Sequence, residues 1–220
     1  MSELVTRHAD LVLLLQRFGI ALGFGDRTVA DVCASAGVDV DFFLLVCNIY
    51  VRPNYSPAPS ALHSVDMGGL VPYLRQSHDY YLHRRLPHIE AHLQHITSQL
   101  PESDRGVLLQ FFSQYSEEVR EHFAYEEEQV YPHVEALLSG QRDDRLRIAD
   151  FARNHGNLEE TLSDLLQIVV RFLPVSAAND ETVSVIYDIM HLSHDLNCHS
   201  LLEEKVLVPY VSMLEKAAGL

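Results

Sequence analysis

The chain reads His-Phe-Ala-Tyr-Glu-Glu-Glu-Gln-Val-Tyr-Pro from His122 to Pro132, and His-Ser-Leu-Leu-Glu-Glu-Lys-Val-Leu-Val-Pro from His199 to Pro209. Both stretches contain His-x-x-x-Glu-Glu, and both place a proline ten positions after the histidine. Residues i and i+4 of a helix lie on one face, with Cβ atoms about 5–6 Å apart. The repeated stretch therefore predicts two helices that each present an imidazole and a carboxylate on the same face.

A second pair of histidines keeps the same offset. The two stretches lie 77 residues apart, since 199 − 122 is 77, and His155 follows His78 by the same number. Each half therefore runs from one histidine to a His-x-x-x-Glu motif 44 residues later. A helix pair that occurs twice predicts a symmetric metal site in a bundle. The candidate ligands are His78, His122, Glu126, His155, His199 and Glu203.

The ligand chemistry narrows the choice of metal. Imidazole and carboxylate suit iron, manganese or zinc, and a carboxylate can bridge two ions. Six ligands are too many for one tetrahedral zinc ion. They favour two ions bridged by two glutamates.

Further histidines follow His78, and they have weaker support. A single His-x-x-x-Glu is more often a helix salt bridge than a metal site, so the repeat carries the argument. His88, His92 and His95 have helical spacing and could bind a metal, but they have no counterparts in the other half. A solvated polar face is the preferred interpretation for them. His83 is kept as a candidate at the cavity mouth.

The residues next to the motifs are interpreted as polar positions. Glu127 and Glu204 lie five residues after a candidate histidine, where a regular α-helix has left the inward face, so they are expected to be solvated. His191 and His194 are expected to be polar positions that could support the ligands.

Residues 1–51 are predicted to form a small domain of three short helices. Thr28 can cap a helix that begins at Val29, and Asp39 can cap the apolar run over residues 40–51. Residues 52–60 are rich in proline and have no helical period, which predicts a linker.

Four long helical segments are predicted after the linker, over about 66–100, 103–138, 143–172 and 180–218. The short connections at Pro101, Gly140 and Pro174 favour antiparallel neighbours. The prediction is an all-α protein with an antiparallel up-down four-helix bundle over residues 61–220. Proline disrupts helices, so the prolines of the two motifs are expected to end or kink the ligand helices.

Composition limits the partners. A formal net charge of −15 argues against nucleic acid, which needs a basic surface. No apolar stretch reaches the roughly 18 residues of a membrane span. The three cysteines form no Cys-x-x-Cys motif, so they are expected to be reduced, mostly buried thiols of a cytoplasmic protein. A homodimer remains open.

The last 160 residues resemble the hemerythrin-like HHE cation-binding domain, and within it the di-iron proteins of the repair-of-iron-centres family. The resemblance is carried by His78-Asp79 with Leu86-Pro87 downstream, by both His-x-x-x-Glu-Glu segments with their prolines, and by His155. It implies a non-haem centre of two iron ions held by the six candidate ligands, with Glu126 and Glu203 as bridging carboxylates.

The resemblance also implies a role in nitric oxide and oxidative stress, with damaged iron–sulfur proteins, nitric oxide or dioxygen as partners. The N-terminal segment resembles the family's small helical domain weakly. Gly23 and Phe24 stand where that domain has adjacent cysteines, and Cys33 and Cys47 do not replace them by spacing.

Two alternatives remain. One is a hemerythrin-like protein that binds or senses dioxygen or nitric oxide. The other is a di-iron oxidoreductase, either a nitric oxide reductase or a peroxidase. Whether the protein is an enzyme stays open, because these classes share one fold and one kind of site.

Overall fold

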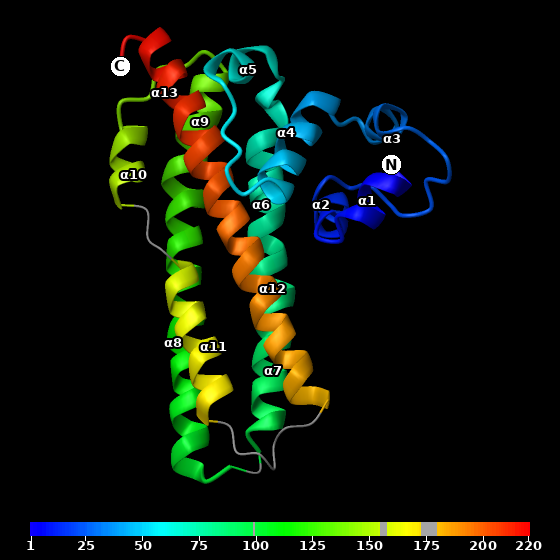
Figure 1. Cartoon of the computed structure of the whole chain (residues 1–220). Coiled ribbons are helices and arrows are strands. Elements are labelled where there is room, and N and C mark those ends of the chain that lie inside the picture. Colours follow the sequence, from blue (N-terminus) through cyan, green and yellow to red (C-terminus); the bar gives the residue numbers. More distant parts are fainter. Residues whose placement is uncertain (99, 155–157, 173–179) are drawn as a thin grey trace. The chain divides into compact units, whose positions relative to one another are not determined.

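The computed structural model of the protein describes residues 1–98, 100–154, 158–172 and 180–220, and no strand occurs among them (Figure 1). The predicted all-α class is confirmed. The first helices along the chain are α1 (Ser2–Arg7), α2 (Leu11–Arg17), α3 (Val29–Ala36), α4 (Val40–Val51), α5 (Pro59–Ser64), the 3-10 turn η1 (Met67–Gly69) and α6 (Leu70–Tyr80). Then follow η2 (Tyr81–Arg85), α7 (Leu86–Ile96), α8 (Glu102–Tyr125), η3 (Glu126–Val130), α9 (Tyr131–Leu138), α10 (Ile148–Asn154), α11 (Leu158–Phe172), α12 (Asp180–Leu202), η5 (Glu203–Leu207) and α13 (Val208–Ala217).

The caps of α3 and α4 are those that the sequence predicts. Thr28 Oγ1 accepts a hydrogen bond from the Asp31 N–H at 3.1 Å, and the Asp31 side chain accepts one from the Thr28 N–H, which completes a capping box. Asp39 Oδ1 accepts from the Phe42 N–H at 2.8 Å. Residues 1–51 nevertheless hold four helices instead of the predicted three, because the chain leaves helical geometry at His8, between α1 and α2.

The chain divides into two compact units. Unit 1 contains residues 1–77, 130–153 and 198–220, and unit 2 contains residues 78–129 and 154–197. The division passes through α6, η3, α10 and α12. The proline-rich segment 52–60 lies within unit 1, so the domain boundary predicted there stays a prediction.

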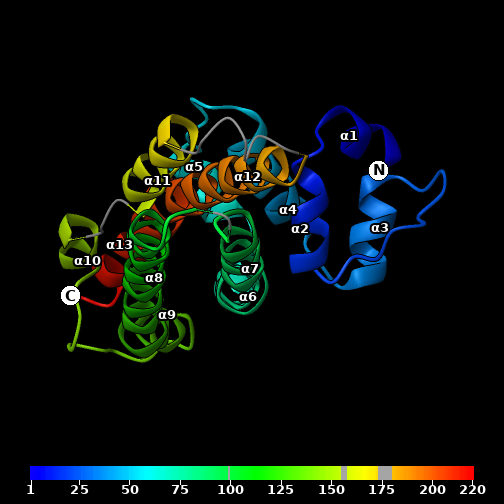
Figure 2. The same ribbon diagram turned by 90° about the horizontal axis from the view of Figure 1, so that it is seen from below.

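In unit 2, segments of α7, α8, α11 and α12 surround one apolar core (Figures 1 and 2). Helix α8 packs against both α7 and α11. Its buried positions Leu108, Phe112, Tyr115, Val119 and Phe123 recur every three or four residues, which is the spacing of one helix face. This apolar stripe fixes which side of α8 faces the core.

In unit 1, the N-terminal helices share one core with later segments of the chain. The rings of Phe18 and Phe42 contact Tyr73 of α6, with centroid distances of 4.8 and 6.5 Å. A Cβ atom at Gly69 would lie 3.2 Å from the Phe42 ring, so glycine allows the close approach of the two segments. Helix α13 packs against α5 and α9 in the same unit.

Three π-helical turns interrupt the long helices within the described residues. Each turn has five residues, and each is followed by an α-helix with proline at its second residue. The Leu86 N–H donates to the Tyr81 carbonyl, and the Val208 N–H donates to the Glu203 carbonyl, in both cases five residues back. The expectation that the prolines of the two motifs end the ligand helices is corrected, because the chain continues as helix beyond Pro132 and Pro209. That they kink these helices stays a prediction. A π turn absorbs the missing N–H and the ring, which a regular α-helix would not accommodate.

No single helix in the described ranges is long and apolar enough to cross a membrane, while α3 and α4 pass that test together, on length and composition, despite a bend of 115°.

Candidate metal centre

Glu126 of unit 2 lies between two imidazole rings. Its Oε2 is 3.1 Å from Nε2 of His78, and its Oε1 is 3.0 Å from Nε2 of His122. The Glu126 side chain is completely buried, His78 is 4% exposed and His122 is 15% exposed. Helices α6 and α8 and the π turn η3 thus bring together three of the six predicted ligands.

The other ring nitrogen of His78 is also engaged. Its Nδ1 is 2.9 Å from Oε1 of Glu127, and its ring stacks on Phe123 with centroids 3.9 Å apart. Glu127 was expected to be a solvated neighbour; its side chain is 34% exposed, but its contact with His78 was not expected. The reason is local: the π turn η3 begins at Glu126, and a π turn brings a residue five positions after His122 back toward the face of that histidine.

Unit 1 contains a second pair of the same kind. His199 Nε2 lies 3.4 Å from Glu203 Oε1, and both side chains are at most 2% exposed. Glu203 begins the π turn η5, as Glu126 begins η3. Glu204 is exposed and forms an ion pair with Lys205, as expected of a solvated neighbour.

These pairs have the chemistry of a metal site. A buried carboxylate is costly unless a partner or a metal ion compensates its charge. His78 and Glu126 of unit 2, and His199 and Glu203 of unit 1, are buried side chains that could hold a metal ion. Imidazole nitrogen and carboxylate oxygen are the donors that iron, manganese and zinc accept.

The remaining histidines differ in their surroundings. His155 lies outside the described residues, so its predicted role stays a prediction. His83 is exposed, with Nδ1 3.1 Å from Asp79 of the preceding turn. His191 and His194 are exposed on α12. His88, His92 and His95 lie on a partly exposed face of α7, as predicted, but they contact carboxylates of α12 that the sequence did not indicate.

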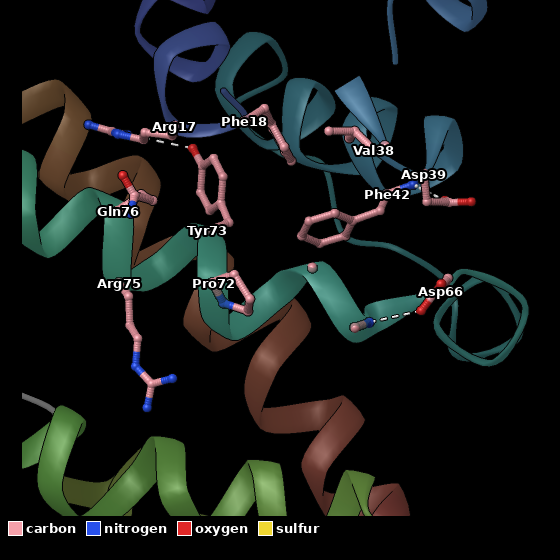
Figure 3. A pocket seen from close by; sticks show the side chains of 13 residues that line it. Arg17, Phe18, Val38, Asp39, Phe42, Asp66, Pro72, Tyr73, Arg75 and Gln76 are labelled. Atoms are coloured by element: carbon pink, nitrogen blue, oxygen red, sulfur yellow. Dashed lines mark hydrogen bonds between the residues drawn. The ribbon is translucent and has the colours of Figure 1, made fainter. Parts of the chain in front are cut away.

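Unit 1 also contains a cleft of ≈ 620 Å³ between the N-terminal helices and α6 (Figure 3). Arg17, Phe18, Phe42 and Tyr73 are among its lining residues, and Arg17 donates to the Tyr73 hydroxyl there at 3.5 Å. Its lining within the described residues contains neither histidine nor cysteine, so the cleft lacks the imidazole and thiolate donors of a transition-metal site.

The thiols of the N-terminal helices are not available for chemistry. Cys33 and Cys47 are free and buried. Burial raises the pKa of Cys33 and raises the pKa of Cys47 to about 12. Because a thiolate is the reactive form, neither residue supplies the reactivity that an exposed cysteine pair would have.

One comparison with known proteins gives a match. A family model described as the Hemerythrin HHE cation binding domain matches residues 71–217, two thirds of the chain. The matched span includes every candidate ligand, from His78 to Glu203. No curated protein and no solved structure matches the chain.

Proposed function

The chain belongs to the hemerythrin HHE cation-binding family, and from this we propose that it is a non-haem di-iron protein of the iron–sulfur-cluster repair type. It would act in the cytoplasm during nitric oxide or oxidative stress. The observation that carries the metal site is the buried His-x-x-x-Glu pair found in each unit, together with the imidazole of His78 on Glu126.

In this proposal Glu126 and Glu203 would each contribute a carboxylate to both metal ions. The two oxygens of Glu126 face two different imidazoles, so each oxygen can serve a different ion beside its own histidine. Glu203 has the same role by the sequence repeat. The joining of both halves into one centre rests on the common offset of 77 residues and on the family. The ligand set is His78, His122, Glu126, His155, His199 and Glu203.

Neighbouring residues prepare the ligands. Glu127 at 2.9 Å holds the proton on Nδ1 of His78, which leaves Nε2 as the ligand nitrogen. The stacked ring of Phe123 fixes the plane of that imidazole and keeps water from one side of it. Bound iron would supply one-electron chemistry toward nitric oxide, dioxygen or the iron of a damaged cluster.

The set of four histidines and two glutamates favours reactivity over reversible carriage. It has one nitrogen fewer than the five-histidine site of hemerythrin-type carriers, so more coordination positions remain for exogenous ligands. This difference separates the repair proposal from the dioxygen-carrier alternative. A di-iron oxidoreductase would have the same open coordination positions. It differs from a repair protein because it would consume nitric oxide or peroxide catalytically.

The first test measures metal content and reversibility. Protein from iron-replete cells is expected to contain about two irons per chain. The anaerobically reduced protein should react with nitric oxide, and exposure to dioxygen should oxidise it irreversibly. Full recovery of the reduced spectrum after removal of dioxygen would instead establish a carrier or sensor.

The second test addresses repair itself. A [4Fe–4S] protein damaged by nitric oxide is incubated with the wild type, and recovery of its cluster spectrum is followed. The Glu126→Ala variant serves as the matched protein without the centre. Equal recovery with both proteins would reject the repair function, and catalytic consumption of nitric oxide or peroxide without cluster recovery would favour an oxidoreductase.

A further inference from the structure

A second group of metal-binding side chains lies within unit 2, between α7 and α12. His88 and His92 stand one helical turn apart on α7, with ring centroids separated by 4.2 Å. Both face Asp188 of α12: its Oδ2 is 3.1 Å from His88 Nε2 and 3.7 Å from His92 Nδ1. The group shares no residue with the proposed di-iron centre.

The distances match the spacing of ligands around one ion. Metal–ligand bonds to imidazole and carboxylate are about 2.0–2.2 Å, so neighbouring ligand atoms lie roughly 3.0 Å apart in octahedral sites and roughly 3.4 Å apart in tetrahedral sites. The two measured separations, 3.1 and 3.7 Å, bracket the tetrahedral value. All three ligand atoms lie within 4.8 Å of one another.

One of these ligand atoms lacks a hydrogen bond. The Nδ1 atom of His92 is buried, and within the described ranges no donor or acceptor lies at hydrogen-bonding distance from it. Its contact with Asp188 at 3.7 Å is too long for a hydrogen bond. Buried polar atoms are usually partnered, and a bound ion is one partner that would satisfy this nitrogen.

Arg85 holds the carboxylate in place. Its guanidinium donates to Asp188 Oδ1 at 2.9 Å and to the Asp188 carbonyl at 3.3 Å. These bonds occupy one carboxylate oxygen and leave Oδ2 toward the two imidazoles. The positive charge of Arg85 weakens the attraction for a cation, so neutral imidazole donors have to supply most of the affinity.

Space for further ligands adjoins the group. A cavity of ≈ 350 Å³ is lined by His92, His95, Ile96, Glu181 and Ser184. His95 Nε2 is 2.9 Å from Glu181 Oε2 in the next turn, so a second imidazole–carboxylate contact continues along the same face. Water can therefore reach an ion bound at Asp188 and complete its coordination.

We propose that His88, His92 and Asp188 form a second metal site, which binds one divalent transition-metal ion and fastens α7 to α12. Two nitrogens and one oxygen select Zn²⁺, Ni²⁺ or Cu²⁺ over Mg²⁺ and Ca²⁺, which prefer oxygen ligands. The partly exposed ligands make this ion exchangeable, unlike one held by the buried pairs. The inference is independent of the function proposed above.

The test uses the full chain with its iron content measured. Isothermal titration with Zn²⁺ should detect one binding event beyond the buried centre, while iron content stays constant. His92→Ala and Asp188→Asn should weaken that event at least tenfold. His83→Ala removes an exposed histidine that lies one turn before His88 and contacts Asp79, and this variant should bind Zn²⁺ like the wild type.

A second measurement separates a site from nonspecific charge. Zn²⁺ should raise the thermal midpoint of the wild type and of His83→Ala, but not that of His92→Ala, and Mg²⁺ should have no effect. The proposal is overturned if the wild type takes up no additional Zn²⁺, if His92→Ala binds it as tightly as the wild type, or if Mg²⁺ competes equally. Loss of iron from His92→Ala would also contradict it, because the two sites would not be independent.

Discussion

A carboxylate that is buried as fully as Glu126 needs compensation for its charge on both oxygens. Its neighbours within unit 2 are the nitrogens of His78 and His122, at 3.1 and 3.0 Å. Bound metal ions would supply this compensation. The three side chains can bind them only through unprotonated ligand atoms. Substitution of Glu126 is therefore the sharpest test of the proposed centre.

Glu126→Ala is expected to lower iron content from about two ions to nearly none, because a bridging carboxylate serves both positions. Glu128→Ala changes an exposed glutamate of the same π turn and should leave the iron content unchanged. Metal analysis and circular dichroism of both variants make the comparison. Retention of one full iron by Glu126→Ala would show that the residue is a terminal ligand and not a bridge.

The cysteines allow a second prediction at this scale. The raised pKa values of Cys33 and Cys47 mean that both thiols stay protonated at neutral pH, and Cys198 is buried as well. A disulfide reagent should therefore modify fewer than one thiol per folded chain within minutes, and three after unfolding. Rapid modification of two thiols in the folded protein would show that at least one of Cys33 and Cys47 opens to solvent and can act chemically.

At the scale of elements, the π turns decide which side chains reach the centre. Each of the two His-x-x-x-Glu motifs has its glutamate at the first residue of a π turn and a proline six positions later. A regular α-helix advances by 100° per residue, so the loss of one π turn would rotate the following helix relative to the ligands. The prolines are thus part of the geometry of the centre.

Pro132→Ala restores a backbone N–H that can donate to the carbonyl four residues back, which favours regular α-helix over the π turn. We expect helix content to be retained and iron content to fall. Pro59→Ala is the matched control, because Pro59 occupies the first turn of α5, where an N–H has no helical partner. Unchanged iron content in Pro132→Ala would show that the π turn forms without the proline.

The loop between α9 and α10 carries a pH-dependent contact. The Arg145 side chain donates to the Asp143 carboxylate at 2.9 Å, and the Arg145 backbone N–H donates to it at 3.0 Å. These hydrogen bonds, the side-chain one most of all, hold the pKa of Asp143 below its usual range. Because the folded-state pKa is lowered, this contact stabilises the fold above the unfolded pKa of about 3.9 and is lost as pH falls through the folded pKa.

Asp143→Asn is therefore expected to lower the free energy of unfolding at pH 7, by about 1 kcal/mol for a partly exposed charged hydrogen bond. The difference from wild type should persist down to about pH 4 and shrink below it. Urea unfolding between pH 7 and pH 2.5 measures it, with Asp164→Asn on the exposed face of α11 as control. A difference that remains constant to pH 2.5 would exclude the carboxylate as its source.

Local contacts could be predicted from the sequence, whereas contacts that depend on irregular helix geometry or on distant residues could not. The caps at Thr28 and Asp39 depend on residues within one turn, so they could be predicted correctly. The contact of Glu127 with His78 was missed because the prediction assumed regular α-helix. The proline six residues after each ligand glutamate was the available signal, since it marks a helix that has to change its hydrogen bonding. The carboxylate of Asp188 beside His88 lies 100 residues away in the chain, and no spacing rule indicates such a contact.

At the scale of the whole molecule, the N-terminal helices share a core with residues 61–77, 130–153 and 198–220. The linker composition of residues 52–60 suggested separate folding, but it carries no information on which apolar faces meet. Phe42 of α4 against Tyr73 of α6 is one such contact, and both side chains are nearly inaccessible to solvent. Removal of residues 1–60 would therefore expose part of this core.

We expect the fragment 61–220 to keep helical structure and iron, because the family match and all candidate ligands lie within it. Its thermal midpoint should be lower than that of the full chain, because Tyr73 loses its contacts with Phe18 and Phe42 and becomes exposed to solvent. Full-length Phe42→Ala, which removes one buried ring, should lose about 3–5 kcal/mol without truncation. A fragment that is helical but free of metal would show that the N-terminal helices complete the centre.

Unit 1 is formed by three separate segments of the chain, and this affects when it can fold during synthesis. Its core joins residues from the first 77 positions of the given sequence to residues after position 197, so it cannot be completed before those later residues have left the ribosome. His199 and Glu203 leave the ribosome after His78 and Glu126. The two His-x-x-x-Glu motifs therefore become available at different times during synthesis, and any metal binding that needs both of them has to follow the emergence of Glu203.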